Sequence, residues 1–471
     1  MLNELKNVLD KDFDYNNLVN STLDIKKNSV LLINNDSETR LDELVLDAIN
    51  KNVKNIITSK NCTLANSKIV KVENYEKTYN ELLIKLCKNF DKKNYFGITG
   101  TNGKTTTGYY LNQLIKNKSM FIGTTEEDLF KNITNEEHLT TPKLFNILKL
   151  LSKEENKDIN DIVIEVSSHA LDQERLKGIY FKVSGFTNLS QDHFDYHKNI
   201  DNYFASKLKM FTEDSSEKFV YVDSEWGNKL KHESKLPSFS IGYKSNNNLY
   251  IEKINVDRES FDLEFYLEGK KYEISVPLSG PLAHMNYLLA LSMAYFSEQY
   301  KLSELLEASA DIKNPLGRYE IFSIDTNDII IDYAHTPESI KQSIAYVKGK
   351  YKNTTVIFGA GGNRDKDKRP LMGDAVNEAD KIIITNDNPR DENEEDIAKD
   401  ILEGVNLNKD VEVELNRKEA IRKGIENLKN DSVLLILGKG HEKIQEFENN
   451  TIKFSDQQVV KEMIKEIQWL Q

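Results

Sequence analysis

Residues 96–114 have the sequence FGITGTNGKTTTGYYLNQL, in which an apolar strand runs into a glycine-rich loop and then into a helix-compatible segment. Backbone N–H groups and the helix N-terminus would therefore face one point. Lys104 adds a positive charge there, and Thr105 offers a hydroxyl to Mg²⁺. The segment predicts a phosphate-binding loop. The alternative is a chance glycine-rich turn, which the flanking strand and helix disfavour.

Apolar segments on both sides of this loop indicate an α/β fold with three domains. A length of 471 residues suits about three domains at roughly 150 residues each. Short strand-like segments predict a small N-terminal domain (1–90). Strand-like and helix-compatible runs then alternate, which predicts a central domain (91–313) with a mostly parallel sheet of the P-loop ATPase type. Within it, residues 249–278 alternate with period two and predict appended antiparallel strands.

Four apolar strands indicate a C-terminal domain (314–471), which we expect to be a Rossmann-like α/β domain. The runs DIIIDYAH, TTVIFGAGG, KIIITNDNP and SVLLILGKGHE each end in Gly, Asp, His or Asn. Ligands of open α/β sheets bind beyond the carboxyl ends of the strands. These four tails therefore mark the predicted functional edge of the domain.

Composition and charge disfavour several classes of protein. The formal net charge of -13, with scattered Lys and Arg, argues against nonspecific binding to nucleic acid or membrane surfaces and favours small-molecule partners. Cys62 and Cys87 show no pairing pattern, and the N-terminus has neither the basic region nor the apolar core of a signal peptide. No apolar stretch approaches about 18 residues. We expect a soluble, cytoplasmic monomer.

Two side chains at strand ends form a candidate metal site. Glu165 ends the strand DIVIE, and His193 follows the strand-like run FTNLS. Hard cations prefer carboxylate oxygen, with imidazole as a less usual addition. Together with Thr105, these residues could hold one or two Mg²⁺ ions. The alternative is that His193 is only a turn residue in the polar cluster Gln191-Asp192-His193.

Lys207 lies on the apolar face of a predicted helix. In NYFASKLKMF (202–211), Phe204, Lys207, Leu208 and Phe211 fall at i, i+3, i+4 and i+7, whereas Lys209 points elsewhere. A buried ammonium tends to lose its proton, and the amine can then react with CO₂ to form an anionic carbamate. The alternative is a lysine whose stem covers apolar surface while its ammonium reaches water.

The loop DNPR (387–390) leaves an apolar strand and presents a planar cation. Pro389 fixes its own φ and favours extended backbone at the residue before it, so the loop is stiff. Arg390 is suited to bind a carboxylate with two hydrogen bonds. The alternative is that Arg390 pairs with Asp391 or Glu392 on the surface.

The phosphate loop resembles that of the Mur ligases, the ATP-dependent amide-forming enzymes of peptidoglycan precursor synthesis, and of their relative folylpolyglutamate synthetase. The general pattern G-x-x-x-x-G-K-[ST] needs glycine where this chain has Ile98, and its glycine comes at Gly100 instead. Further motifs over about residues 95–445 are similar to the MurE type in order and spacing: TTP (140–142), EVSSHALDQERL (165–176), FTNLSQDHFDYH (186–197), GRYE (317–320), DYAHTPES (332–339), GAGGNRDKDKRPLMG (359–373), DNPR (387–390) and GKGHE (438–442).

This resemblance implies a ligase that adds meso-diaminopimelate to UDP-N-acetylmuramoyl-L-alanyl-D-glutamate through an acyl phosphate, with ATP as co-substrate and Mg²⁺ as cofactor. It implies a carbamylated lysine at Lys207 that helps hold a second Mg²⁺, with Thr105, Glu165 and His193 as further metal ligands. The implied catalytic residues are Lys104, Lys207, Glu165 and His193. The residues implied for the UDP substrate are Ser21, Thr140, Thr141, Ser167, Gln173 and Arg175.

Two further sets of residues follow from the same resemblance. The ATP-binding residues would be Gly100, Thr101, Asn102, Gly103, Lys104, Thr105, Thr106, Asn286, Arg318, Asp332 and His335, although Ala283 replaces an asparagine usual in the family. The amino-acid-binding residues would be Arg364, Asp387, Asn388, Pro389, Arg390, Gly438 and Glu442. In MurE-type enzymes D-N-P-R accompanies selection of meso-diaminopimelate, whose distal carboxylate lysine lacks, and Glu442 suits the distal ammonium.

Three alternative functions stay open. The first is a lysine-adding ligase of the same architecture. The second is folylpolyglutamate synthetase, in which DNPR and GKGHE would have no assigned task. The third, from a different class, is a nucleotide-binding regulatory module without ligase activity. The presence of Lys104, Glu165, His193 and Lys207 argues against the third.

Overall fold

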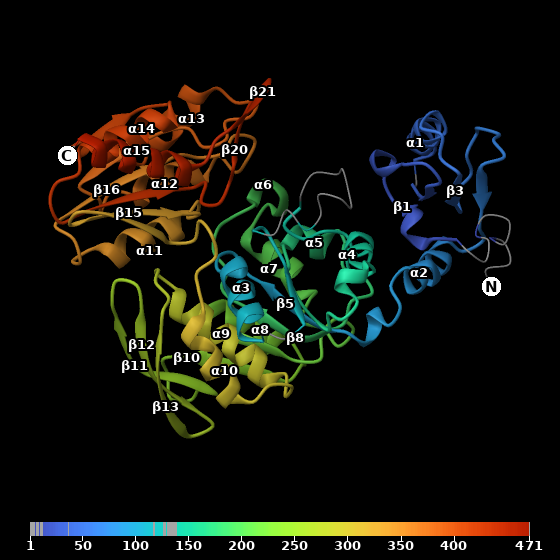
Figure 1. Ribbon diagram of the computed structural model, residues 1–471, viewed down its shortest axis with the longest axis horizontal. Helices are drawn as coiled ribbons and strands as arrows, with labels where there is room; N and C mark the ends of the chain where they lie inside the picture. The colour runs from blue at the N-terminus through green and yellow to red at the C-terminus, as the bar shows by residue number, and fades with distance from the viewer. Residues whose placement is uncertain are drawn as a thin grey trace. The chain divides into compact units, whose positions relative to one another are not determined.

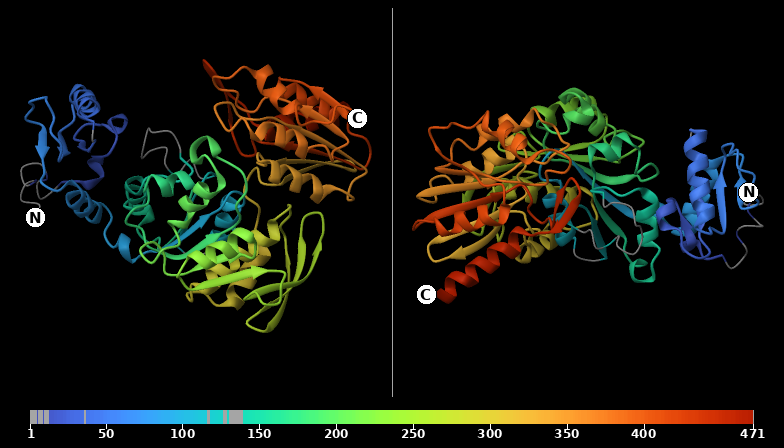
Figure 2. Two further views of the ribbon diagram at one scale, coloured as in Figure 1. Left: turned by 180° about the vertical axis from the view of Figure 1, so that it is seen from behind. Right: turned by 90° about the horizontal axis from the view of Figure 1, so that it is seen from above.

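The structure is a computed structural model, and it describes residues 5, 9, 13–35, 37–115, 118–125, 129 and 139–470. The chain divides into two compact units, Met1–Tyr95 with Asn117–Phe181 and Phe96–Lys116 with Lys182–Gln471. The colours of Figures 1 and 2 follow the chain from blue at the N-terminus to red at the C-terminus.

The first unit begins with a small parallel sheet. Its strands are adjacent in the order β1-β2-β3-β4, and all neighbours run parallel. Leu41, Val45 and Ala48 lie on one side of helix α1 and belong to the buried core beside the sheet, because their spacing places them on one helix face. The elements are β1 (Leu18–Val19), β2 (Val30–Leu32), α1 (Glu38–Asn50), β3 (Asn55–Thr58), β4 (Ile69–Lys71) and α2 (Tyr75–Leu86).

The first unit also contains the strand that carries Glu165. This strand, β7 (Asp161–Glu165), is buried along its whole length and pairs in parallel with β6 (Ser119–Ile122). Two helices accompany the pair, α4 (Leu144–Leu151) and α5 (Ser168–Asp172). The expected strand DIVIE is therefore present, and Glu165 is its last residue.

The second unit opens with a sheet of mixed direction, in which the strands follow the order β13-β12-β11-β10-β9-β8-β5. β8, β9, β10 and β11 are joined by parallel pairings, as the alternation of strands and helices predicts. Its strands are β5 (Asn94–Thr99), β8 (Phe181–Phe186), β9 (Phe219–Val222), β10 (Ser238–Gly242), β11 (Leu249–Val256), β12 (Phe261–Leu267) and β13 (Lys270–Val276).

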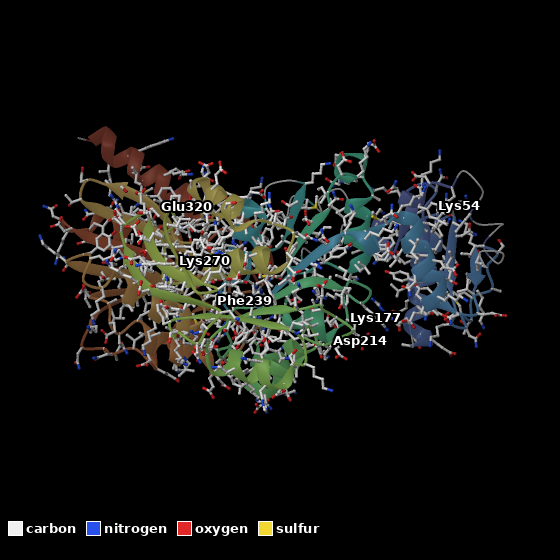
Figure 3. All side chains as sticks on the ribbon, turned by 90° about the horizontal axis from the view of Figure 1, so that it is seen from below. Lys54, Lys177, Asp214, Phe239, Lys270 and Glu320 are labelled. Atoms are coloured by element: carbon white, nitrogen blue, oxygen red, sulfur yellow. The ribbon has the colours of Figure 1, made fainter. Side chains whose placement is uncertain are left out.

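The last three of these strands confirm the expected antiparallel extension. β11 pairs antiparallel with β12, and β12 with β13. Helix α9 supports the neighbouring part of the sheet, where Phe239 of β10, labelled in Figure 3, packs with its ring centroid 5.3 Å from that of Phe296. The helices of this part are α3 (Lys104–Leu114), α6 (Phe194–His197), α7 (Ile200–Leu208), α8 (Glu225–Glu233), α9 (Ala283–Phe296) and α10 (Leu302–Ala308).

A six-stranded sheet forms the C-terminal part of the second unit, with the strand order β14-β15-β19-β16-β17-β18. All neighbours are parallel except the edge strand β14, which is antiparallel to β15. The four apolar runs of the sequence form the central strands β15, β19, β16 and β17. The strands are β14 (Glu320–Ile324), β15 (Asn327–Asp332), β16 (Asn353–Phe358), β17 (Lys381–Ile384), β18 (Asp410–Val413) and β19 (Ser432–Leu437), with a separate hairpin β20 (Ile444–Phe447) and β21 (Asn450–Lys453).

Helices cover both faces of this sheet, which explains why its strands are apolar without alternation. Successive side chains of a strand point to opposite faces. Accordingly, Ile382 and Ile384 belong to one buried core, and Ile383 belongs to the other. The first core includes side chains of α11 (Pro337–Val347), α12 (Lys368–Ala375) and α13 (Glu394–Leu402), and the second includes those of α14 (Arg417–Glu426) and α15 (Asp456–Leu470).

A fully buried ion pair joins the last two helices to the functional edge of this sheet. Arg417 donates from Nε and Nη2 to the two carboxylate oxygens of Asp456, at 2.8 Å each, and neither side chain is exposed. The same guanidinium donates to the backbone oxygens of Asn386, at 3.3 Å, and Leu437, at 3.0 Å. One side chain thus ties together the loops that follow β17 and β19.

Within the described ranges, no helix combines the length and the apolar composition that a membrane crossing would need.

We predict that Asp456→Asn destabilises the protein strongly. Removal of one charge leaves the Arg417 guanidinium buried without its counter-ion, which costs about 3–5 kcal/mol in free energy of unfolding. Lys418→Ala is the matched control, because it removes an exposed pair at 3.6 Å with Glu462 across the same two helices. That change should cost less than about 1 kcal/mol. Scanning calorimetry tests this, and equal unfolding temperatures for the two variants would contradict it.

Candidate active site

The phosphate loop is a tight turn between β5 and α3 that requires glycine at two positions. Gly100 and Gly103 have φ values of +150° and +86°. A Cβ at Gly100 would lie 1.9 Å from Oγ1 of Thr187, and one at Gly103 would lie 2.4 Å from Oδ1 of Asn286. The loop therefore packs against two other segments so closely that no side chain fits.

The segment after β8 holds the loop by a set of hydrogen bonds. The backbone N–H groups of Thr101 and Asn102 donate at 3.0 Å to the carbonyl oxygen and to Oδ1 of Asn188. In return, Oγ1 of Thr187 and Nδ2 of Asn188 donate to the carbonyl oxygen of Asn102, at 2.7 and 3.0 Å. The backbone N–H of Ser190 donates to Oγ1 of Thr101 at 3.0 Å. Hydrogen bonds within the protein therefore fix the conformation of the loop.

Cationic and hydroxyl groups cluster where α3 begins. Nζ of Lys104 lies 2.8 Å from the carbonyl oxygen of Thr101 and 3.2 Å from that of Gly100. Nη2 of Arg318 donates to Oγ1 of Thr105 at 3.2 Å. Thr106 is half-buried in the first helical turn. Backbone N–H groups of a helix N-terminus and two cations provide a site suited to phosphate.

Lys207 is buried in this loop region, and the expected distinction from Lys209 is confirmed because Lys209 is exposed. Nζ of Lys207 donates to the carbonyl oxygen of Gly100 at 2.8 Å and lies 4.4 Å from the ring centroid of Tyr203. Burial, followed by the charge of Lys104, holds the pKa of Lys207 well below its usual range. The interpretation of an ammonium that reaches water is therefore wrong.

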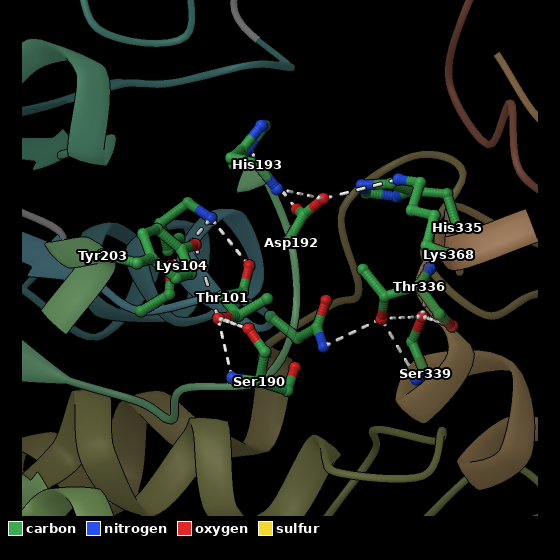
Figure 4. A network of polar contacts seen from close by, with 12 residues as sticks. Thr101, Lys104, Ser190, Asp192, His193, Tyr203, His335, Thr336, Ser339 and Lys368 are labelled. Atoms are coloured by element: carbon green, nitrogen blue, oxygen red, sulfur yellow. Dashed lines mark hydrogen bonds and ion pairs between the residues drawn. The ribbon is translucent and has the colours of Figure 1, made fainter. Parts of the chain in front are cut away.

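Asp192 connects the loop region to the C-terminal sheet in the network of Figure 4. Its carboxylate lies 3.3 Å from Nε2 of His193 and 3.4 Å from Nζ of Lys368, and both Asp192 and Lys368 are buried. Burial alone would raise the pKa of Asp192, but the charges of Lys368 and His193 lower it below its usual range. His193 has φ +55° and lies directly before α6 as its N-cap residue.

The predicted nucleotide residues of the DYAH segment lie beside this network. The carboxylate of Asp332 accepts hydrogen bonds from the backbone N–H groups of Tyr319, at 2.7 Å, and Ala334, at 2.8 Å. Burial raises its pKa. Nδ1 of His335 lies 2.7 Å from the carbonyl oxygen of Tyr333, and burial together with the charge of Lys368 lowers the pKa of His335 to about 4. The imidazole is therefore neutral at physiological pH.

Asn102 and Asn286 complete the contacts around the loop. Nδ2 of Asn102 donates at 3.2 Å to Oγ1 of Thr336, the residue that caps α11. Oδ1 of Asn286 accepts from Oγ1 of Thr107 at 3.4 Å. Predicted ATP-binding residues of the phosphate loop, of GRYE and of DYAH, together with Asn286, thus lie near the phosphate loop.

The first unit brings together a second set of predicted residues. Oγ1 of Thr141 donates to the carbonyl oxygen of Glu165 at 2.7 Å, and Nη1 of Arg175 donates to the carbonyl oxygen of Thr141 at 3.1 Å. Ser167 caps α5, and Gln173 accepts from Arg175 at 2.8 Å. Oε2 of Glu165 accepts from the N–H and Oγ1 of Thr124, at 3.0 and 2.9 Å.

Among the residues that the structure describes, two predicted substrate residues form no hydrogen bond to that set. Thr140 is half-buried next to Thr141. Ser21 lies beside β1 of the small sheet, where its Oγ accepts from the N–H of Leu23 at 3.3 Å and caps a short helical turn.

The predicted amino-acid-binding residues follow the carboxyl ends of β16, β17 and β19. Nδ2 of Asn388 donates to Oε2 of Glu442 at 2.9 Å. Lys439, which is fully buried, donates to Oδ1 of Asn388 at 2.9 Å and to Oε2 of Glu442 at 2.8 Å. Burial and the charge of Asp387 raise the pKa of Glu442. A Cβ at Gly438 would lie 2.6 Å from Oδ2 of Asp387, so the two loops are in close contact.

Arg390 has a partner that the sequence did not suggest. Its Nε donates to Oε2 of Glu446 at 2.9 Å, and its Nη1 donates to the carbonyl oxygen of Gly362 at 2.8 Å. The alternative surface pairing with Asp391 or Glu392 is not formed among the described residues. Glu392 instead accepts from the buried Arg369 at 3.0 and 3.1 Å.

Backbone contacts fix the same loops. A Cβ at Gly362 would lie 1.8 Å from the carbonyl oxygen of Pro389, so the loops after β16 and β17 touch directly. A Cβ at Gly361 would lie 3.1 Å from Nη1 of Arg390 and 3.7 Å from Cγ of Arg364. The two predicted arginines therefore both lie close to Gly361.

The donor set expected for Mg²⁺ has suitable chemistry, because hydroxyl, carboxylate, imidazole and carbamate are hard donors. Among the residues that the structure describes, no group of three or more His, Cys, Asp or Glu is arranged to hold a metal ion. Glu165 and His193 are the two members of the expected set that belong to these types. Thr105, His193 and Lys207 belong to the second unit and Glu165 to the first, and the buried amine of Lys207 suits carbamate formation.

Sequence reasoning missed Asp192, Lys368, Lys439 and Glu446. Asp192 directly precedes His193, so the DH pair could have drawn attention to it. Lys368 is one of several charged residues in GNRDKDKRP, and the sequence does not distinguish it from Lys366. Glu446 lies in a short hairpin outside every motif, and no sequence signal indicates its contact with Arg390.

Comparisons with known proteins agree with this arrangement. The family description Mur ligase middle domain matches residues 98–294, and Mur ligase, glutamate ligase domain matches residues 317–440. A UDP-N-acetylmuramoyl-L-alanyl-D-glutamate--2,6-diaminopimelate ligase of Aquifex aeolicus is 39% identical over 380 residues, covering 79% of this chain and 78% of that protein. The ligase of the same name from Rickettsia prowazekii is 33% identical over 479 residues, covering 98% of each.

Solved structures share the fold. One of a UDP-N-acetylmuramoyl-L-alanyl-D-glutamate--2,6-diaminopimelate ligase has a TM-score of 0.64 at 22% identity and covers 98% of this chain and 99% of that one. MurF ligase from Thermotoga maritima in complex with ADP has a TM-score of 0.68 at 16% identity and covers 98% of this chain and 100% of that one. Since the Aquifex relative is 39% identical over more than two thirds of both chains, this protein belongs to the Mur ligase family.

Proposed function

We propose that the protein is the ligase that couples meso-diaminopimelate to UDP-N-acetylmuramoyl-L-alanyl-D-glutamate with consumption of ATP. The observation that carries this proposal is the position of Arg390 and Glu442 in neighbouring loops, joined through Asn388. A cation and a carboxylate placed together suit the distal carboxylate and ammonium of a diamino diacid. The names of the relatives at 39% and 33% identity support the same substrate.

The phosphate loop would hold ATP for the first half of the reaction. The γ-phosphoryl group passes to a carboxylate oxygen of the UDP substrate and ADP leaves, which creates an acyl phosphate. Lys104 is 2.8 Å from the carbonyl oxygen of Thr101, within the loop, and would turn to the transferring phosphoryl group. Arg318, which donates to Thr105, would add charge from the C-terminal side.

The second half forms the amide bond. The amine of meso-diaminopimelate attacks the acyl carbon, loses a proton, and expels phosphate. The protein contributes position and charge rather than a covalent step. Mg²⁺, held by Thr105, Glu165, His193 and carbamylated Lys207, would neutralise phosphate charge when bound.

The remaining predicted residues would position the substrates. Asp332 and His335 would contact the nucleotide from the DYAH segment, with His335 neutral at physiological pH because of its lowered pKa. Asn286 would lie beside the nucleotide, since its Oδ1 is in contact range of Gly103. The UDP substrate would be bound by the set around Thr141, with Ser21 at its nucleotide end: Thr140, Thr141, Ser167, Gln173 and Arg175.

We further propose three domains at 1–90, 91–313 and 314–471, and a cytoplasmic monomer. The chain passes from one sheet to the other between α10 and β14, which supports the proposed boundary at 313–314. Cys62 and Cys87 are both free thiols, which suits a reducing compartment.

The first prediction for the proposed function concerns Lys104. Lys104→Ala should lower kcat at least a hundredfold, the effect typical for loss of one group that stabilises transferred charge. The fold should persist, because the side chain is only half-buried at the start of α3. Phosphate release and thermal unfolding measure the two properties. A folded variant with near-parental turnover would refute the role of Lys104.

The second prediction concerns Lys207. Lys207→Ala should be almost inactive, and formate or another short carboxylic acid should partly restore activity by replacing the carbamate. Lys209→Ala is the matched control, because Lys209 is exposed two residues away and should behave like the parent. Initial rates with and without formate measure this. Equal activity of both alanine variants would exclude a carbamate at Lys207.

The third prediction concerns Arg390. The parent should prefer meso-diaminopimelate to lysine by well over tenfold, because a charge-assisted contact is worth roughly 1.5–3 kcal/mol. Arg390→Ala should lose most meso-diaminopimelate activity and leave the KM for ATP nearly unchanged. Arg390→Lys should recover little, since one ammonium cannot donate to both Glu446 and Gly362 from a planar fork.

Parallel kinetics with meso-diaminopimelate and lysine provide the measurement for Arg390. A parent enzyme that couples lysine as efficiently as meso-diaminopimelate would favour the lysine-adding alternative. Phosphate release that needs both the UDP substrate and an amino acid would exclude a nucleotide-binding module without ligase activity.

A further inference from the structure

Arg390 is held in a defined orientation by the hairpin β20–β21. Its backbone N–H donates to the carbonyl oxygen of Glu446 at 3.1 Å, and a β-bridge pairs it with Phe447. Its side chain returns to the same strand, because Nε donates to Oε2 of Glu446 at 2.9 Å. Arg390 has φ +53°, a conformation uncommon for residues with side chains, so backbone contacts of this kind are needed to keep it.

A second nitrogen of the guanidinium also has a fixed partner. Its Nη1 donates to the carbonyl oxygen of Gly362 at 2.8 Å, in the loop after β16. Two acceptors on different nitrogens define the plane of the group, so Arg390 cannot turn freely about its last bonds. Within the part of the chain that the structure describes, no hydrogen bond from Nη2 to the protein is recorded. The terminal edge of the guanidinium therefore keeps donors for a ligand.

We infer that Glu446 is a positioning residue for amino-acid selection, which holds the Arg390 guanidinium so that its Nη1 and Nη2 edge meets the distal carboxylate of the substrate. The inference rests on the proposed function, and it adds a residue that no motif of the chain contains. The arginine side chain has several rotatable bonds, and a fixed orientation reduces the rotamer entropy that it loses on substrate binding.

A negative charge beside Arg390 could also repel the substrate carboxylate, and the geometry indicates which effect is larger. The Glu446 and Arg390 side chains are both partly exposed, at 32% and 26%, so water and salt screen the repulsion. Loss of orientation is not screened, because it concerns the conformations of Arg390 itself. Glu446 should therefore strengthen binding of the distal carboxylate.

Three variants of the full chain test this inference: Glu446→Ala, Glu446→Gln and Glu448→Ala. Glu446→Ala should raise the KM for meso-diaminopimelate about tenfold, or about 1.4 kcal/mol, with little change in kcat or in the KM for ATP. Glu446→Gln keeps an oxygen acceptor for Nε and should stay within about threefold of the parent. Glu448→Ala, an exposed residue of the same hairpin, should match the parent.

A double-mutant cycle with Arg390→Ala separates positioning from a general effect on the fold. If Glu446 acts through Arg390, Glu446→Ala should change the KM for meso-diaminopimelate little when Arg390 is already absent. The ratio of kcat/KM for meso-diaminopimelate to that for lysine should fall about tenfold in Glu446→Ala alone. Thermal unfolding of all variants provides the check on folding.

The inference fails if Glu446→Ala leaves the KM unchanged or lowers it, since the side chain would then be neutral or a competitor. It also fails if Glu446→Gln is impaired as much as Glu446→Ala, or if the two substitutions have additive effects. A parent enzyme that does not use meso-diaminopimelate would overturn the proposed function and this inference together. That outcome is visible before any substitution, so the two failures are distinguishable.

Discussion

The hydrogen bonds between the phosphate loop and the segment after β8 are the contacts on which the candidate active site depends. Asn188 holds the backbone of Thr101 and Asn102 from one side, and Thr187 leaves no room for a side chain at Gly100. The loop carbonyl of Gly100 then accepts from the buried Lys207. Since His193 and Asp192 follow directly on the same segment, the loop, the lysine and the charged network are fixed together.

Buried charges are handled in two different ways in this protein. Arg417 keeps its charge, because Asp456 and two carbonyl oxygens satisfy its donors in a fully buried place. Lys207 has a carbonyl partner and an aromatic ring but no carboxylate within ion-pair distance among the described residues, and its pKa is held low. An unpaired buried amine is reactive, whereas a paired buried guanidinium is structural. The amine of Lys207 therefore suits chemistry, and the guanidinium of Arg417 holds two loops together.

The proposed amino-acid-binding residues lie in loops after three strands of one sheet. Glycines at 361, 362 and 438 let these loops approach one another, and Asn388, Lys439 and Glu442 form a closed polar set. Arg390 is attached to this set through the hairpin that carries Glu446. The direction of its guanidinium therefore depends on the loop after β16 and on the hairpin β20–β21, and not on the DNPR motif alone.

The sequence by itself determined the fold class, the apolar central strands and the position of the phosphate loop. Runs such as KIII and SVLLIL are apolar because helices cover both sheet faces. A residue that follows such a run lies at a strand end, whatever position that strand takes in the sheet. These features follow from local composition and periodicity. The spacing of Phe204, Lys207 and Phe211 likewise predicted which lysine is buried.

Only the tertiary structure decided the partners of the charged groups. Asp192 meets Lys368 across 176 positions of sequence, and Arg390 meets Glu446 across 56. The sequence offered nearer partners, such as Asp391 and Glu392 for Arg390, but the buried Arg369 takes Glu392. Local periodicity carries no information about which distant side chains meet, because that depends on how strands are ordered in the sheet and how closely their loops pack.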